Sequence, residues 1–181
     1  MNSPSNQKTC PHTATTKGAT DHPEPCHRLF CYGTLQIPAV LEAVIGHRLQ
    51  GMRTVLPGYA ACQIRRAEYP GLIRSPGNKT SGRLYSHVTP LELDVLDRFE
   101  GRLYRRQHKI VLKDSGQRIQ AWVYMVAPGK NKQLTKRPWH LDRFMRTDYH
   151  RFMRRFVMDR RIFYMGETVD DPVWNVPGCR A

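Results

Sequence analysis

Acidic residues are scarce in this 181-residue chain, which has 15 Asp and Glu against 29 Lys and Arg and a formal net charge of +14. A surface of this charge attracts anions, whether nucleic acid, phospholipid or an anionic metabolite. The excess lies in residues 28–128, at +8, and in residues 129–181, at +6, while residues 1–27 are neutral. No recognisable nucleic-acid-binding motif accompanies the charge, which argues against a dedicated nucleic-acid binder.

Long apolar runs and regularly spaced cysteines are also missing. No stretch is apolar enough over the length needed to span a membrane, and the N-terminus has no apolar segment typical of a secretory signal. The five cysteines have irregular spacing and include no Cys-x-x-Cys pair, which argues against a disulfide framework and a structural zinc site. We therefore expect a cytoplasmic protein.

The composition divides the chain into three parts. Residues 1–27 have no aromatic and almost no aliphatic side chain, so they are predicted to form a disordered polar tail. Residues 28–128 carry strand and helix patterns and are predicted to form one domain. Residues 129–181 are predicted to be a basic extension, linker-like at 130–137 and helical from Trp139 to about Phe163. The apolar stripe of this amphipathic helix is predicted to pack on the domain or to form a homodimer interface, and it comprises Leu141, Met145, Tyr149, Phe152 and Phe156.

The patterns within residues 28–128 predict mostly antiparallel strands with two short helices, an α+β fold. Predicted strands cover Arg28–Tyr32, Leu49–Leu56, Tyr59–Ile64, Arg83–Val88, Arg106–Leu112 and Arg118–Val126. Pro57-Gly58 is expected to be a turn between two of them. One helix is predicted over Pro38–Ile45, with Gly46 as its stop. The second begins at a capping box, Thr89-Pro90-Leu91-Glu92, and ends at Gly101.

One candidate site feature is Tyr32-Gly33-Thr34-Leu35, between a buried strand and a helix. Such a turn exposes backbone N–H groups that suit a carboxylate or a developing oxyanion, and glycine lets a ligand approach the backbone closely. A plain turn is the alternative reading of the same residues.

The other candidate is Glu100. Leu93, Leu96 and Glu100 share one helical face, so Glu100 continues the side that should pack on the sheet. The helix C-terminus and partial burial both favour a raised carboxyl pKa, which suits general acid–base catalysis. A salt bridge from Glu100 to Arg102 or Arg105 is the alternative.

Taken as a set, these motifs resemble one known family over Leu29 to Ala127. The matching residues are Tyr32-Gly33-Thr34-Leu35, Gly82-x-Leu84-Tyr85, Leu96-Asp97-x-Phe99-Glu100-Gly101 and Tyr104-x-Arg106. Their order and spacing resemble the γ-glutamylcyclotransferase superfamily, in particular its AIG2-like branch. The resemblance implies a small mixed β-barrel with helices packed around it.

The resemblance also implies an activity. Family members cleave γ-glutamyl amides: the substrate's α-amine attacks its own γ-carbonyl, forming 5-oxoproline and releasing an amine. By resemblance Glu100 is the catalytic acid/base and Tyr32, Gly33, Thr34 and Leu35 bind the γ-glutamyl group. Tyr104 and Arg106 are expected to line the pocket or to brace Glu100, and Arg106 is a candidate partner for the substrate's carboxylate. No metal or organic cofactor is required, because the nucleophile belongs to the substrate.

Two alternatives stay open beside this enzyme. One is a non-catalytic module of the same fold that binds a small ligand. The other is a nucleic-acid binder that uses the arginines of the C-terminal helix. The amine half of the γ-glutamyl substrate is not specified by the sequence.

Overall fold

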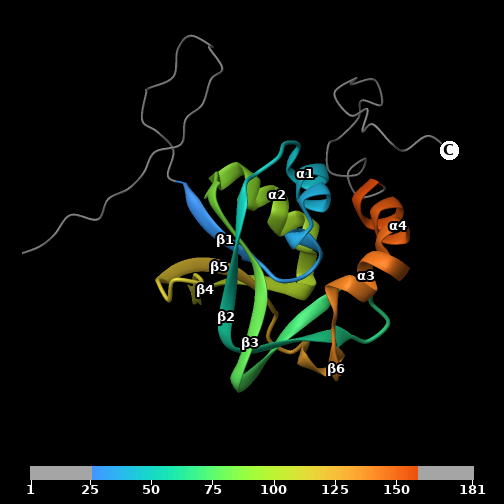
Figure 1. Ribbon diagram of the computed structural model, residues 1–181. Coiled ribbons are helices and arrows are strands. Elements are labelled where there is room, and N and C mark those ends of the chain that lie inside the picture. Colours follow the sequence, from blue (N-terminus) through green and yellow to red (C-terminus); the bar gives the residue numbers. More distant parts are fainter. Residues whose placement is uncertain (1–25, 159–181) are drawn as a thin grey trace, which may run out of the picture.

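The structure, a computed structural model, describes residues 26–158 (Figure 1). The strands are β1 His27–Cys31, β2 Gly51–Ile64, β3 Pro70–Val88, β4 Tyr104–Leu112, β5 Arg118–Val126 and β6 Leu134–Pro138. The helices are α1 Pro38–Ile45, α2 Pro90–Glu100, α3 Leu141–Thr147 and α4 Tyr149–Phe152, with short turns η1 Thr34–Gln36, η2 Gly101–Leu103 and η3 Asn131–Gln133 and a π-helical stretch, Met153–Met158. The predicted polar tail lies outside the described residues up to residue 25.

Five of the strands close into a barrel. β1 pairs with β3 and, in parallel, with β5; β5 pairs with β4, β4 with β2, and β2 with β3, all antiparallel. β6 adds to the far end of β2. Closure leaves few unpaired strand edges, and the result confirms the predicted α+β fold with a small mixed barrel.

The expected turn at Pro57-Gly58 is wrong. β2 runs through it as one 14-residue strand paired with the 19-residue β3, from Gly51 opposite Tyr85 to Gln63 opposite Pro70. The register shifts between Pro57 and Tyr59, where Gly58 has a φ of +76°. A bulge thus absorbs the turn-forming residues and bends the strand instead of ending it.

Both predicted helices of the domain are present with their predicted ends. Gly46 closes α1 with a φ of +95°. At the start of α2, the Thr89 N–H donates to Glu92 Oε2 at 2.7 Å and the Glu92 N–H donates to Thr89 Oγ1 at 3.2 Å. The two helices lie together against one side of the barrel (Figure 1). α2 ends at Glu100, immediately before the turn into β4.

Two apolar clusters hold the fold. One lies between the barrel and the helices and includes Leu29, Leu96 and Phe144; the other lies inside the barrel around Phe30 and Val111. β3 pairs closely with β1 beside Gly82, where a Cβ would clash with the Cys31 carbonyl oxygen. Only glycine permits this close approach of the two strands. The Tyr32–Leu35 loop follows directly after this point of β1.

The segment after residue 128 differs from the expected linker and single long helix. Its residues 134–138 form β6, which pairs Leu134 with Ile64. The helix is interrupted at Asp148, with a φ of −120°, into α3 and the short α4. Phe144 is buried, whereas Met145, from the predicted stripe, is 40% exposed. The side chain of Phe156 lies outside the described part.

Three further features concern the cysteines and the membrane. Cys31 and Cys62 are buried free thiols, while Cys26 is disulfide-bonded, which the sequence did not predict. Across residues 26–158, none of the helices has the length and apolar character that crossing a membrane requires.

Candidate functional site

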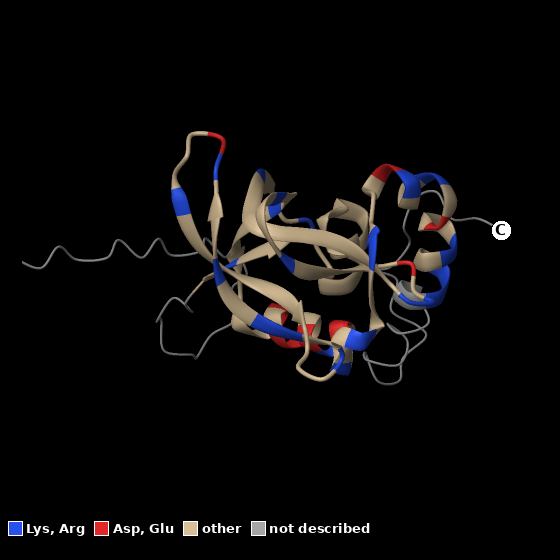
Figure 2. Ribbon diagram, turned by 90° about the horizontal axis from the view of Figure 1, so that it is seen from below, with Lys and Arg blue, Asp and Glu red and all other residues tan. Residues whose placement is uncertain are grey.

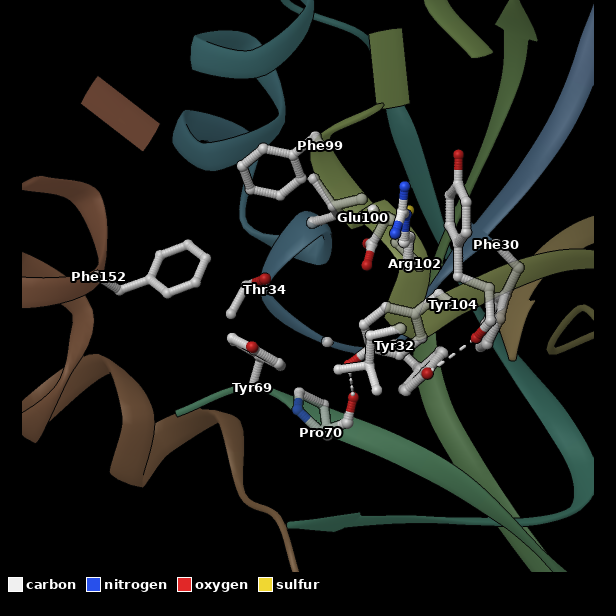
Figure 3. A pocket seen from close by; sticks show the side chains of 16 residues that line it. Phe30, Tyr32, Thr34, Tyr69, Pro70, Phe99, Glu100, Arg102, Tyr104 and Phe152 are labelled. Atoms are coloured by element: carbon white, nitrogen blue, oxygen red, sulfur yellow. Dashed lines mark hydrogen bonds between the residues drawn. The ribbon is translucent and has the colours of Figure 1, made fainter. Parts of the chain in front are cut away.

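A pocket of about 210 Å³ brings the two sequence motifs together. It opens where the end of β1, the turn η1, the start of β3 and the end of α2 meet (Figure 3). Its lining is Phe30, Cys31, Tyr32, Gly33, Thr34, Leu35, Tyr69, Pro70, Phe99, Glu100, Gly101, Arg102, Leu103, Tyr104, Tyr124 and Phe152. Glu100 and the Tyr32–Leu35 loop thus share one small cavity.

Glu100 points into this cavity from the end of α2, with the Tyr32 and Thr34 side chains around its carboxyl group (Figure 3). Its charge acts on its neighbours. Burial raises the pKa of Cys31, Tyr32, Tyr104 and Tyr124, and the Glu100 carboxylate raises each of them further. A negative charge at Glu100 therefore disfavours ionisation of these four side chains.

Three pocket tyrosines use their hydroxyl groups as donors to the protein. Tyr32 donates to the Tyr124 carbonyl at 2.9 Å, Tyr104 to the Pro70 carbonyl at 2.6 Å, and Tyr124 to Asp97 Oδ1 at 2.8 Å. With their pKa raised by burial, these hydroxyls stay protonated at neutral pH. They shape the cavity and are unsuited to act as bases.

The Tyr32–Leu35 loop offers amide donors. Its fold is fixed by the Gln36 side chain, which donates to the Tyr32 carbonyl at 2.6 Å, and by the Gln36 N–H, which donates to the Gly33 carbonyl at 3.2 Å. Among the described residues, the N–H groups of Gly33, Thr34 and Leu35 have no backbone acceptor outside regular strands and helices. A Cβ at Gly33 would lie 3.0 Å from the Pro70 ring, so a side chain there would crowd the cavity wall.

Arg106 is the predicted site residue that does not line the pocket. Its guanidinium pairs with Asp97 on α2, Nε to Oδ1 at 2.6 Å and Nη2 to Oδ2 at 2.7 Å, and lies 5.1 Å from the centre of the Trp122 ring. The hydrogen bond to Asp97 is the main cause of its raised pKa. Arg106 therefore contacts the helix that carries Glu100 from outside the cavity.

Ten of the sixteen lining residues were not assigned to the site by the sequence, and Tyr69, Phe99, Arg102 and Phe152 are among them. Phe99 and Arg102 flank the Glu100-Gly101 pair, so adjacency was an available signal. Tyr69 precedes β3 and Phe152 belongs to α4, and no local pattern connects either to the Tyr32–Leu35 loop.

The charge distribution favours an anionic ligand. Four of the seven acidic residues between 28 and 128 are on α2, namely Glu92, Asp94, Asp97 and Glu100. Figure 2 shows this acidic helix, with Lys and Arg spread over the strands and over α3 and α4. Because basic residues outnumber acidic ones over the rest of the described chain, small anions are attracted towards the protein.

The chain is similar to plant proteins and to solved structures of this architecture. It is 25% identical over 156 residues to AIG2-like protein B of Arabidopsis thaliana, covering 84% of this chain and 90% of that protein. It is 31% identical over 103 residues to AIG2-like protein D of the same plant, covering 56% and 68%.

Two solved structures share the fold. The solution structure of an Arabidopsis thaliana protein matches with a TM-score of 0.58 at 20% identity, covering 91% of this chain and 100% of that one. A structure described as gamma-glutamyl cyclotransferase matches with a TM-score of 0.50 at 15% identity, covering 56% and 66%.

The family model described as gamma-glutamyl cyclotransferase, AIG2-like, matches residues 29–151. The match includes both motifs of the pocket and continues through β6 and α3 into α4. With the mixed barrel and the shared cavity, this match assigns the protein: the chain belongs to the AIG2-like gamma-glutamyl cyclotransferase family.

Proposed function

We propose that the chain is an enzyme that cleaves a γ-glutamyl amide by intramolecular aminolysis. The α-amine nitrogen of the substrate forms a bond to its γ-carbonyl carbon, and the bond from that carbon to the amide nitrogen breaks. The products are 5-oxoproline and a free amine. The observation that carries the proposal is the common cavity of Glu100 and the Tyr32–Leu35 loop.

Glu100 transfers the protons in this scheme. The α-amine is protonated at neutral pH, so its attack requires a base, and the leaving nitrogen must gain a proton. Glu100 takes up the two protons that the α-ammonium group loses, one after the other, and passes each to the departing nitrogen. The amine leaves as an ammonium ion, and no water is consumed. A positioned carboxyl group of this kind contributes about 10²- to 10⁴-fold in rate.

Other ionisable groups of the cavity are unsuited to that task. The tyrosine hydroxyls are donors held by the protein. Burial raises the pKa of the Cys31 thiol, so it remains a thiol and not a thiolate nucleophile. Within the described lining, Glu100 is the sole carboxylate and histidine is absent.

Two further groups orient the substrate. The N–H groups of Gly33, Thr34 and Leu35 are suited to stabilise the oxyanion that develops on the γ-carbonyl oxygen. Arg102, an exposed lining residue two positions after Glu100, is suited to bind the α-carboxylate beside the reacting amine. Both interactions hold the substrate folded for ring closure, which contributes through orientation.

The test measures 5-oxoproline release from a panel of γ-glutamyl amides by wild type and by Glu100→Gln. We expect a fall of about 10²- to 10⁴-fold in kcat for the variant. Glu42→Gln is the matched control, since Glu42 lies on α1 and pairs with Arg48 outside the cavity. Equal release by wild type and Glu100→Gln would refute the mechanism.

Two other outcomes distinguish the alternatives. Binding of γ-glutamyl amides without any 5-oxoproline would make the protein a binding module. Tight nucleic-acid binding that falls steeply with salt and depends on Arg151 or Arg154 would support the third reading.

A further inference from the structure

The pocket around Glu100 has a polar part and an aromatic part. Its polar groups are the hydroxyls of Tyr32 and Tyr104 and the amides of the Tyr32–Leu35 loop. Phe99, Tyr69 and Phe152 lie around Thr34 on one side of Glu100 (Figure 3). The three aromatic residues, here called the aromatic wall, come from the end of α2, the turn before β3, and α4. None has a role in the proton transfer or in holding the γ-glutamyl group.

The aromatic wall is held in place by packing within the protein. Phe152 is 1% exposed and Phe99 is 9% exposed, and both belong to the cluster between barrel and helices. The Tyr69 ring lies 6.4 Å from the Tyr104 ring, centre to centre. An apolar ligand group would therefore meet side chains that are already ordered, which lowers the entropic cost of binding.

Polar contacts outside the cavity fix the wall. Arg151, next to Phe152, donates to Glu68 Oε1 at 2.6 Å, and Glu68 is the neighbour of Tyr69. The Trp139 indole N–H donates to the Glu68 carbonyl at 2.8 Å. These contacts join α4 to the turn before β3, so two sides of the wall are held together.

The charges of the cavity restrict the amine half further. Among the described lining residues, Glu100 and Arg102 are the charged side chains, and the proposed function uses both on the γ-glutamyl group. A second carboxylate on the substrate would lack a cation, and a second ammonium would lack an anion, beside apolar rings. Burying either charge unpaired is costly.

We propose that the released amine is a small aromatic or branched aliphatic amine that carries no charged group other than the amine nitrogen itself. The inference rests on the proposed function and names the class of its substrate. The cavity of about 210 Å³ is below the roughly 300–1,000 Å³ of drug-sized ligand sites, so the γ-glutamyl group leaves room for a single ring or a short branched chain. Amino acids, glutathione and polyamines are disfavoured as amine halves because each carries a further charge.

The test compares kcat/KM for five γ-glutamyl amides: those of benzylamine, isobutylamine, glycine, phenylalanine and putrescine. We expect benzylamine and isobutylamine to exceed glycine and putrescine by about 10- to 100-fold. Phenylalanine, which keeps the ring but adds a carboxylate, should fall below benzylamine. Equal or better turnover of the glycine or putrescine amide would overturn the inference.

Binding of the same five amides to Glu100→Gln, measured by calorimetry, separates the two proposals. Preference for the benzylamine amide without turnover by wild type would retain the apolar subsite and refute the proposed function. Turnover of all amides, with no preference in kcat/KM or in binding, would retain the function and refute the subsite.

Substitutions in the aromatic wall test whether it causes the preference for apolar amines. Tyr69→Ala and Phe152→Leu should each lower kcat/KM for the benzylamine amide about tenfold and change that for the glycine amide little. Tyr59→Ala is the control, because Tyr59 packs near Lys109 and does not line the cavity. Because Phe152 is also a core residue, Tyr69→Ala carries the test if Phe152→Leu does not fold. An equal fall for all amides in folded Tyr69→Ala would contradict the assignment.

Discussion

Asp97 and Arg106 form a two-pronged ion pair that joins α2 to the barrel, with Arg106 Nε and Nη2 at 2.6 and 2.7 Å from the two carboxylate oxygens. Tyr124 on β5 donates to one of these oxygens at 2.8 Å. Asp97 is three residues before Glu100 on α2, so the same helical turn holds the ion pair and the proposed base. The orientation of Glu100 therefore depends on a contact outside the cavity.

Asp97→Asn should weaken both the fold and the proposed reaction. The variant keeps the size of the side chain and removes the charge that holds Arg106. Since the Asp97 side chain is 41% exposed, we expect a loss of about 1–2 kcal/mol in the free energy of unfolding, measured in urea. We expect kcat for 5-oxoproline release to fall more than KM rises, because Glu100 loses its orientation while the substrate contacts remain.

Asp94→Asn is the control for this prediction, because Asp94 is exposed on the same helix. It should change the free energy of unfolding by less than about 0.5 kcal/mol. An Asp97→Asn variant with unchanged kcat would contradict the view that this ion pair orients Glu100.

Thr89→Ala should destabilise the protein without changing the chemistry. The Thr89 side chain accepts from the Glu92 N–H at the start of α2, about three helical turns from Glu100. Loss of a cap of this kind costs about 0.5–2 kcal/mol. Urea unfolding should show this loss, while kcat per folded molecule stays at the wild-type value; Thr89→Ser should restore stability. Wild-type stability in Thr89→Ala would mean that the cap contributes nothing.

The helix ends were predictable because their signals are local. Thr89, Glu92 and Gly101 act within one or two turns of the backbone they cap. The hairpin of β4 and β5 was predictable for the same reason, since Gly116 with a φ of +79° lies between two alternating segments. The turn predicted at Pro57-Gly58 was wrong because these residue types suit either a turn or a bulge. The long pairing of β2 with β3, which no local pattern encodes, selects the bulge.

The lining of the site was predictable only where a motif carried it. Tyr104 and Arg106 lie on the same face of β4, but residues two apart on a strand are about 6.6 Å apart. The Tyr104 hydroxyl thus donates to the Pro70 carbonyl at the cavity, whereas the Arg106 guanidinium donates to Asp97 on α2. The position of Phe152 depends on the packing of α4, which no short sequence pattern encodes.

The register of α3 gives a test in which neighbouring residues have opposite outcomes. Phe144 is 2% exposed and packs against Trp139 and Phe152, while Met145 is 40% exposed. Phe144→Ala should cost about 3–5 kcal/mol in the free energy of unfolding, and Met145→Ala should change it by less than about 0.5 kcal/mol. Urea unfolding of the two variants provides the measurement. A larger loss of unfolding free energy for Met145→Ala than for Phe144→Ala would contradict this register and support the apolar stripe predicted from the sequence.

Stability should decrease above about pH 10, the ordinary tyrosine pKa. Burial raises the pKa of Tyr32, Tyr104 and Tyr124 in the folded protein. As the pH rises, the unfolded chain therefore loses these protons first, which favours unfolding; below pH 10 both states are protonated and the contribution is intact. Each such group lowers the free energy of unfolding by up to about 1.4 kcal/mol per pH unit above that point.

Tyr104→Phe tests this assignment through the slope of stability against pH. The variant loses the donor to the Pro70 carbonyl, so its stability falls at every pH, but it also loses one titrating group. Between pH 10 and 11 its free energy of unfolding in urea should decline less steeply than that of wild type. Val123→Ala is the control, since Val123 is fully buried inside the barrel and does not titrate; it should lower stability and keep the wild-type slope. A wild-type slope in Tyr104→Phe would mean that Tyr104 ionises as readily in the folded protein as in the unfolded chain.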